Sequence, residues 1–305
     1  MLLALASIWG ASFLFIKVLS DAGVEATGIT AGRSSLGFLT LVPLAYYFRR
    51  QFPRDRRTWA MLAFLGLLNF GLPWTLFGVA ARHAPSGASS VVNALQPLWA
   101  ALLAVVLLKS EPLGGRRIVG LFLGFVGVCA LMGQDMVESD RAGAGAIVLM
   151  AGATACYAMS GVLIRRWLQH VPAFPLAFVQ IGVSALTLVP IALATGAYSG
   201  AEVSPGAVTS LLILGAGGSG LAIVAFMWLI QQVGPVRAAV VTYLLPPVGV
   251  TLGWLVLDEP VGWNLILGLG FIICGVALVQ QAPLAALFRR FSPRPAREPA
   301  IKPAD

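Results

Sequence analysis

Polar and aromatic side chains stand in the middle of long apolar runs of this sequence, and they are the residues best suited to bind a solute. A polar side chain in such a run is costly against lipid, so it should face other helices or a cavity. Amides and hydroxyls can orient a solute's polar end, and aromatic faces can bind its apolar or cationic part. The candidates for lining one cavity are Trp9, Ser12, Asn69, Trp74, Asn93, Gln96, Tyr157, Ser160 and Tyr243. The alternative for each is hydrogen bonding or packing between helices.

Two cations, Lys17 and Arg33, also lie inside apolar runs, within a turn or two of the run ends. Each could bind an anionic group such as a carboxylate, or could extend its charged end towards the headgroups. Carboxylates are absent from the deep part of every run. Glu111 and Glu259 stand at run ends directly before Pro, which favours a helix-terminus cap in the turn between neighbouring runs over proton coupling.

One sequence motif is a weak indication of catalytic chemistry. Residues 217–220, Gly-Gly-Ser-Gly, match the G-x-S-G of intramembrane serine proteases of the rhomboid type. A serine nucleophile needs a general base within hydrogen-bond reach, and His83 and His170 both precede it and lie near loops. The three cysteines lie inside apolar runs without metal-ligand spacing. The sequence therefore predicts no enzyme, no metal and no cofactor, with the protease as an alternative.

The composition predicts that lipid surrounds most of the chain. Hydrophobic residues make up 58% and charged residues 10% of the 305 residues, with a mean hydropathy of +0.88, whereas soluble proteins carry roughly 25% charged residues. The net charge of +8 does not indicate nucleic-acid binding, because the basic residues lie between apolar runs.

Ten apolar runs are long enough to be membrane-spanning helices. They cover about residues 1–20, 27–48, 59–81, 86–108, 117–134, 144–165, 172–195, 208–231, 236–257 and 262–281. With ten spans, 16 of the 20 Lys and Arg residues fall on one side of the membrane and on the C-terminal tail. Basic loops stay cytoplasmic, so the chain is predicted to have both termini inside.

The two halves of the chain repeat each other at an offset of about 148 residues. LTLVP at 39–43 recurs at 186–190, and Glu111-Pro112 recurs as Glu259-Pro260. This divides the chain into 1–134, 143–281 and a basic, Pro-rich tail at 282–305, which we expect to be cytoplasmic and disordered. Five spans per repeat is an odd number, so the repeats are inverted, an arrangement that puts a transport site near the midplane between them. The predicted fold class is an all-α integral membrane protein of ten transmembrane helices.

The residues Trp9-Gly10-Ala11-Ser12-Phe13 followed by Lys17 resemble the first helix of EamA-type transporters of the drug/metabolite transporter superfamily. Arg33 and the two Glu-Pro pairs fit the same pattern, although many members have Asn where Ser12 stands. The resemblance covers about residues 1–281. It implies alternating-access export or exchange of amino acids, related metabolites or amphipathic compounds. An exchanger of phosphorylated or nucleotide-linked sugars is an alternative.

The expected partners are a small-molecule substrate and the lipid bilayer of the inner cell membrane, where the chain would be multi-pass. Gly120 and Gly124 form a G-x-x-x-G pattern, which allows close helix approach. It suggests either a weak homo-oligomer or packing within the chain.

Overall fold

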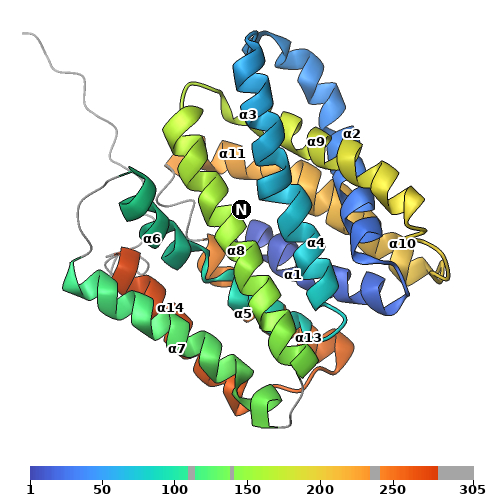
Figure 1. Ribbon diagram of the computed structural model, residues 1–305. Coiled ribbons are helices and arrows are strands. Elements are labelled where there is room, and N and C mark those ends of the chain that lie inside the picture. Colours follow the sequence, from blue (N-terminus) through green and yellow to red (C-terminus); the bar gives the residue numbers. More distant parts are fainter. Residues whose placement is uncertain (109–113, 138–140, 234–240, 281–305) are drawn as a thin grey trace, which may run out of the picture.

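The computed structural model describes residues 1–108, 114–137, 141–233 and 241–280, and this part of the chain is entirely helical apart from turns (Figure 1). The basic tail and Glu111 lie outside the described residues. The helical elements are α1 (Leu2–Asp21), α2 (Ala26–Tyr47), η1 (Arg49–Gln51), α3 (Arg56–Gly66), η2 (Leu67–Gly71), α4 (Leu72–Ala80), α5 (Ser86–Asn93), α6 (Gln96–Leu108), α7 (Gly115–Val137), α8 (Arg141–Trp167), α9 (Ala173–Ala194), α10 (Pro205–Leu212), η3 (Ile213–Leu221), α11 (Ala222–Val233), α13 (Val241–Leu257) and α14 (Trp263–Gln280).

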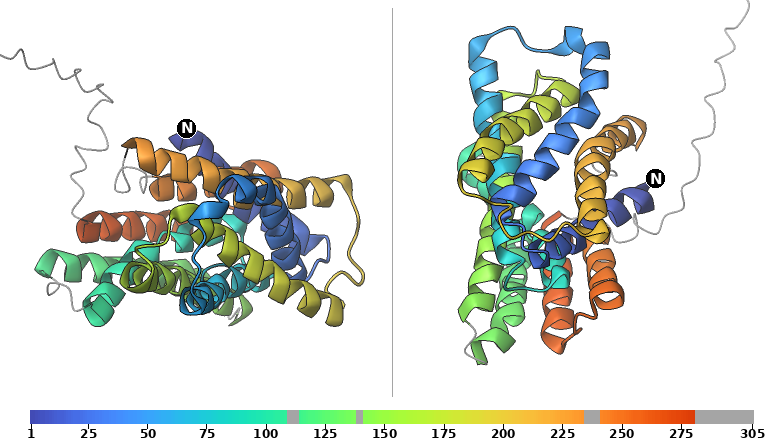
Figure 2. Two further views of the ribbon diagram at one scale, coloured as in Figure 1. Left: turned by 90° about the horizontal axis from the view of Figure 1, so that it is seen from above. Right: turned by 90° about the vertical axis from the view of Figure 1, so that its right-hand side faces the viewer.

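Several of these helices, alone or joined end to end, are long and apolar enough to cross a membrane. Seven meet that description among the described residues, and two shorter apolar helices cover Leu244–Leu257 and Trp263–Val279. The helices pack as one bundle in which α3, η2 and α4 form a continuous rod, as do α10, η3 and α11 (Figure 2). The chain is therefore a multi-pass membrane protein.

Helix α2 is long but is not among those seven, because its 22 residues include Thr, Ser and Arg side chains. Neighbouring helices supply partners for some of these groups. Thr30 accepts a hydrogen bond from Thr75 of α4 (3.2 Å), and the hydroxyls of Ser34 and Ser184 of α9 lie 2.8 Å apart. A helix this polar is tolerated because its neighbours supply the partners that lipid cannot.

Two rods are interrupted by π-helical turns at similar places in the two halves. η2 includes Asn69 and Gly71, with Pro73 two residues beyond it, and η3 includes Gly217, Gly218 and Gly220. Proline lacks an N–H, and glycine weakens a helix interior. Such widened turns occur frequently at functional sites. A further break separates α5 from α6 just before Gln96 and Pro97.

Helices α7 and α14 lie side by side at one edge of the bundle and touch through glycines (Figure 1). A Cβ on Gly120 would lie 2.6 Å from the carbonyl oxygen of Gly275, and one on Gly127 would lie 2.9 Å from that of Gly268. A Cβ on Gly124 would collide with Leu98. The Gly120/Gly124 face is therefore covered by the chain's own helices. Of the two uses suggested by the sequence, the structure shows packing within the chain, and the weak homo-oligomer stays a prediction.

Contacts in one half have counterparts in the other. α1 packs on α13 and on the rod containing η3, and α8 packs correspondingly on α6 and on α4. α2 packs along α9, and α5 packs on α13. The offset of 148 residues exchanges α2 with α9. The largest buried cluster of apolar side chains lies among these contacts and includes Leu5, Val92, Met150 and Leu245.

Candidate functional site

Arg33 is the centre of the most unusual polar arrangement in the bundle. It lies in the first half of α2 and is 7% exposed. Its Nε donates a hydrogen bond to the hydroxyl of Ser219 on η3 (2.8 Å), and that hydroxyl donates to the carbonyl of Leu214 (3.1 Å). In the part of the chain that the structure describes, ion pairs join only Lys17 to Asp21 and Arg82 to Glu25. Arg33 is thus a buried cation without a described carboxylate partner.

Aromatic rings enclose the charged group. The guanidinium carbon of Arg33 lies 3.8 Å from the ring centroid of Trp74 on α4, which is a cation–π contact. Tyr157 of α8 lies within interaction range of Arg33 and of the Trp74 indole N–H. Tyr157 also stacks with Phe77 at a centroid distance of 6.3 Å. The cation therefore lies in an aromatic frame built from two helices of different halves.

Trp9 joins α1 to the same π-helical turn. Its indole N–H donates to the carbonyl of Gly218 (2.9 Å), and its ring meets the edge of Phe226 on α11 at 5.0 Å. The Ser12 hydroxyl bonds to its own helix at Ile8, and it would lie 3.4 Å from a Cβ on Gly218. Gly218 and Ser219 are consecutive, so Trp9 and Arg33 bind neighbouring residues of η3.

The structure thus brings together five of the predicted residues: Trp9, Ser12, Arg33, Trp74 and Tyr157. Together with Ser219 we call them the central cluster. The aromatic members Trp9 and Tyr157 and the neighbouring Phe226 are half-buried. The cluster can therefore offer a cation, a hydroxyl and aromatic faces to a solute.

Other predicted residues have different surroundings. Asn69 donates to Gln180 of α9 (3.0 Å), which is a contact between helices. Ser160 is fully buried, and its hydroxyl has no described partner. Asn93 is buried at the end of α5, and Gln96 is half-buried at the start of α6. The side chain of Tyr243 lies outside the described residues.

Lys17, a predicted ligand for an anionic solute, has an ion-pair partner on its own helix. Its ammonium group pairs with Asp21, one turn further along α1, at 2.8 Å. Both residues lie at the end of the helix, where the Asp21 side chain is about half exposed. A lysine whose charge is already matched at a helix end does not belong to the central cluster.

Sequence reasoning missed the polar partners on α9. Gln180 is fully buried, and its side-chain nitrogen has no described partner, while Ser184 bonds to Ser34. The spacing of four residues in the pairs Thr30/Ser34 and Gln180/Ser184 puts each pair on one helix face. This four-residue spacing in the sequence could have indicated the two polar pairs.

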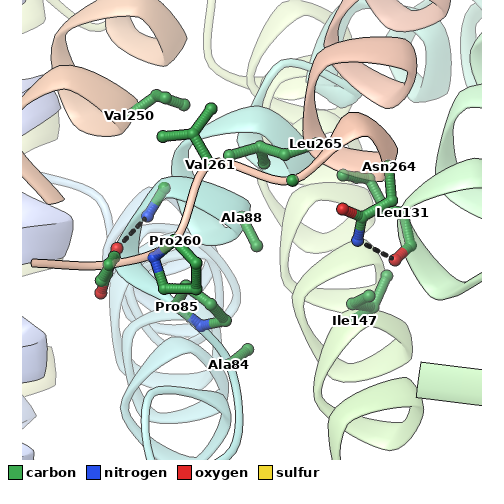
Figure 3. Close-up of a pocket in the computed structure, with 13 residues that line it drawn as sticks. Ala84, Pro85, Ala88, Leu131, Ile147, Val250, Pro260, Val261, Asn264 and Leu265 are labelled. Carbon is green, nitrogen blue, oxygen red and sulfur yellow. Dashed lines mark hydrogen bonds between the residues drawn. The ribbon is translucent and has the colours of Figure 1, made fainter. Parts of the chain in front are cut away.

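A separate cavity of about 240 Å³ opens where α5 begins, α13 ends and α14 begins (Figure 3). Its walls include Pro85, Ala88, Leu131 and Val261, and they contain none of the central cluster. Asn264 donates to the carbonyl of Leu131 (3.4 Å) across it. Its polar side chains already have protein partners, so the central cluster is the better candidate for solute binding.

Glu259 beside this cavity caps a helix, but not the helix that follows it. Its carboxylate accepts hydrogen bonds from the backbone N–H groups of Ser86 (2.7 Å) and Gly87 (3.1 Å) and from the Ser86 hydroxyl (2.9 Å). These groups form the first turn of α5. The expectation of a cap is confirmed, whereas its location in the turn before α14 is wrong.

The protease alternative is not favoured by the surroundings of Ser219. Its hydroxyl accepts from Arg33, which does not act as a general base because it stays protonated. His83 and His170 are both exposed at the ends of helices. Within the described ranges, no group of three His, Cys, Asp or Glu side chains could hold a metal ion.

A bundle of apolar helices that gathers a buried cation, hydroxyls and aromatic rings in its interior defines a membrane protein of the transporter class. The model of the EamA-like transporter family matches the chain twice, over residues 1–133 and 144–280. The chain belongs to this family, which is one of transporters rather than enzymes.

Characterised and uncharacterised relatives agree with this assignment. The chain is 28% identical to Protein PecM of Dickeya dadantii over 78% of this chain and 79% of that protein. It is 23% identical to the uncharacterized transporter YoaV of Bacillus subtilis, over 70% of both chains. It is 32% identical to the threonine/homoserine exporter RhtA of Escherichia coli K12, over 63% of this chain and 60% of that one.

A solved crystal structure has the same fold. It superposes with a TM-score of 0.59 and covers 90% of this chain and 97% of that chain, at 18% sequence identity. At this identity the likeness concerns the fold alone.

Proposed function

We propose that the protein is a secondary transporter that exports a small metabolite by alternating access. Its solutes are amino acids or other small zwitterionic or amphipathic compounds. The observation that carries the proposal is the central cluster, where α1, α2 and α4 of one half meet α8 and η3 of the other around Arg33. A solute bound there touches both halves, which is what alternating access requires.

The proposed topology has ten spans in two inverted repeats, with both termini in the cytoplasm. Two observations support it. The helix contacts in one half have counterparts in the other, and the glycine contacts of α7 and α14 are reciprocal. Gly120 corresponds to Gly268 and Gly127 to Gly275 under the offset, and the contacts are Gly120 to Gly275 and Gly127 to Gly268. Such an exchange is what a two-fold axis between the helices produces.

Export from the cytoplasm across the inner cell membrane is the proposed direction. The support is the similarity to a protein named as a threonine/homoserine exporter. The small-molecule substrate and the bilayer are the proposed partners, and nucleic acid is not among them. Exchange of phosphorylated or nucleotide-linked sugars is disfavoured, because Arg33 is the single cation of the central cluster, whereas a phosphate group carries more negative charge.

The test is a comparison of the growth medium of bacterial cells that express the chain with that of cells carrying an empty vector. Mass spectrometry of the medium should show at least one small metabolite that accumulates outside only when the chain is made. Loading the cells with dipeptides of each amino acid raises the internal pools and widens the range of solutes tested. A medium that is identical in both strains under every load would refute export.

A further inference from the structure

The charge of Arg33 lacks a counter-charge within the described bundle. Burying an unpaired ion is costly, and buried charges in proteins are normally paired. The residues that contact Arg33 are a hydroxyl and aromatic rings, and none of them carries a negative charge at neutral pH. The bundle therefore holds one positive charge that an anion could neutralise.

The hydrogen bond with Ser219 leaves most of the guanidinium free. Only Nε donates to Ser219, and the Ser219 proton is directed to Leu214. The N–H groups on the two terminal nitrogens have no described acceptor. Trp74 covers one face of the guanidinium plane, and the edge that carries these N–H groups can donate hydrogen bonds to a ligand.

From this arrangement we infer that Arg33 binds the carboxylate of the transported solute, and that the substrates are therefore small monocarboxylates such as amino acids. The inference rests on the proposed transport function and names its substrate class. A guanidinium presents parallel N–H groups that match the two oxygens of a carboxylate. One positive charge matches one carboxylate, and the described residues around it provide no second cation for a phosphate dianion.

The surrounding rings suit the remainder of such a solute. The rings of Tyr157 and Phe77 are stacked next to the cation. Trp9 donates a hydrogen bond to Gly218, the residue before Ser219 on η3. An ammonium group can bind the face of an aromatic ring, and an apolar side chain can pack on it. The cluster can thus accept an amino acid without a protein carboxylate.

A purely structural Arg33 is the competing explanation. In that case it would tie α2 to η3 and α4, and its removal would weaken the fold. A ligand-binding Arg33 is a destabilising buried charge when the site is empty, so its removal should leave the empty protein at least as stable. Removal of a structural Arg33 should lower the melting temperature, whereas removal of a ligand-binding Arg33 should lower transport without lowering the melting temperature.

The experiment compares four proteins in the medium assay: the wild type, Arg33→Gln, Arg33→Lys and Arg82→Gln. Arg82 is the control, because it is a partly exposed arginine paired with Glu25 outside the cluster. Exported metabolites are treated with acidic methanol, which esterifies carboxylates and identifies them by mass. Each variant is also purified in detergent, and its melting temperature is measured without solute.

Every exported compound should carry a carboxylate. Arg33→Gln should lower its accumulation by about ten- to hundredfold, the loss expected for a hydrogen-bonded charge. Arg33→Lys should keep an intermediate rate, Arg82→Gln should match the wild type, and the melting temperature of Arg33→Gln should not fall.

Three results would overturn the inference while export stands: compounds without a carboxylate, undiminished accumulation with Arg33→Gln, or loss of both folding and transport in Arg33→Gln and Arg33→Lys alike. No export by the wild type would instead remove the proposed function and the inference with it.

Discussion

The Nε of Arg33 on α2 lies 2.8 Å from the hydroxyl oxygen of Ser219 on η3, so the only described polar bond of the buried cation crosses between the two halves of the chain. The bond also fixes which edge of the guanidinium stays free. Ser219 is therefore a positioning residue for Arg33, and its contribution can be measured separately from that of the charge.

Ser219→Ala should lower the free energy of unfolding by about 1–3 kcal/mol, because the substitution leaves a buried donor of Arg33 unpaired. Transport should fall less than with Arg33→Gln, since the charge remains. The matched control is Ser35→Ala on α2, whose hydroxyl bonds only to its own helix at Ala31. Thermal unfolding of the purified proteins checks the prediction. Proteolysis of a membrane substrate that disappears in Ser219→Ala would contradict the transporter assignment.

Trp9→Phe should reduce stability by about 0.5–1.5 kcal/mol, because it removes the N–H that donates to Gly218 but keeps a ring against Phe226. Trp99→Phe is the control. The Trp99 indole N–H is buried without a described partner, so its removal should be neutral or stabilising. Equal effects of the two substitutions would show that the Gly218 bond contributes nothing.

Truncation of Tyr157 tests whether the aromatic frame binds solute. Tyr157→Ala should weaken solute affinity by about 1–3 kcal/mol, the range for losing a buried contact in a binding site. A wall of a solvated site tolerates truncation better than a packed core, so the melting temperature should change little. Affinity and melting temperature are measured on the same preparation. A large drop in stability, of about 3–5 kcal/mol, with unchanged affinity would make Tyr157 a packing residue.

Glu259→Gln should destabilise the protein by about 0.5–2 kcal/mol, the usual size of a helix cap, because it removes the negative charge from the first turn of α5. Asp258→Asn, which removes the negative charge of the residue directly before Glu259, is the control. Asp258 adopts a positive φ of 52°, a conformation that Asn accepts as well as Asp. Chemical or thermal unfolding of both variants gives the comparison, and equal stabilities would mean that the cap is unimportant.

Gly275→Ala should be destabilising by about 1–3 kcal/mol, because a Cβ there would lie 2.5 Å from the carbonyl oxygen of Gly120 and force α7 and α14 apart. Gly270→Ala on the same helix meets nothing within 4 Å. It should be slightly stabilising, by roughly 0.5–1 kcal/mol, through helix propensity. Equal melting temperatures would show that the glycine contact is loose in the membrane.

The sequence could predict the helices well, because lipid leaves few alternatives. The apolar runs agree with the helix ends to within a few residues, with α1 at Leu2–Asp21 and α9 at Ala173–Ala194 as examples. Arg33, Trp9 and Tyr157 were identified from their depth within these runs, since a polar or amphipathic side chain at that depth needs protein partners.

The sequence could not predict which helix ends meet in space. Glu259 was expected to cap in its own turn, but it reaches Ser86 of the other half. Asn69 was a candidate either for the cavity or for a bond between helices, and the structure shows its hydrogen bond to Gln180 on α9. Lys17, by contrast, pairs with Asp21 only four residues away on the same helix. For Glu259 and Asn69 the polar group was correctly noticed, but its partner depends on packing between distant segments.

The glycine contact between α7 and α14 sets the kind of motion that the bundle can perform. Gly120, Gly124 and Gly275 bring backbone against backbone there, and these three residues have no side chain that could bend to absorb a displacement. The two halves therefore cannot slide past each other or separate along this edge without losing the contact altogether. For the proposed alternating access we therefore expect the other helices to rock about this edge, with the largest displacement on the side of the molecule furthest from α7 and α14.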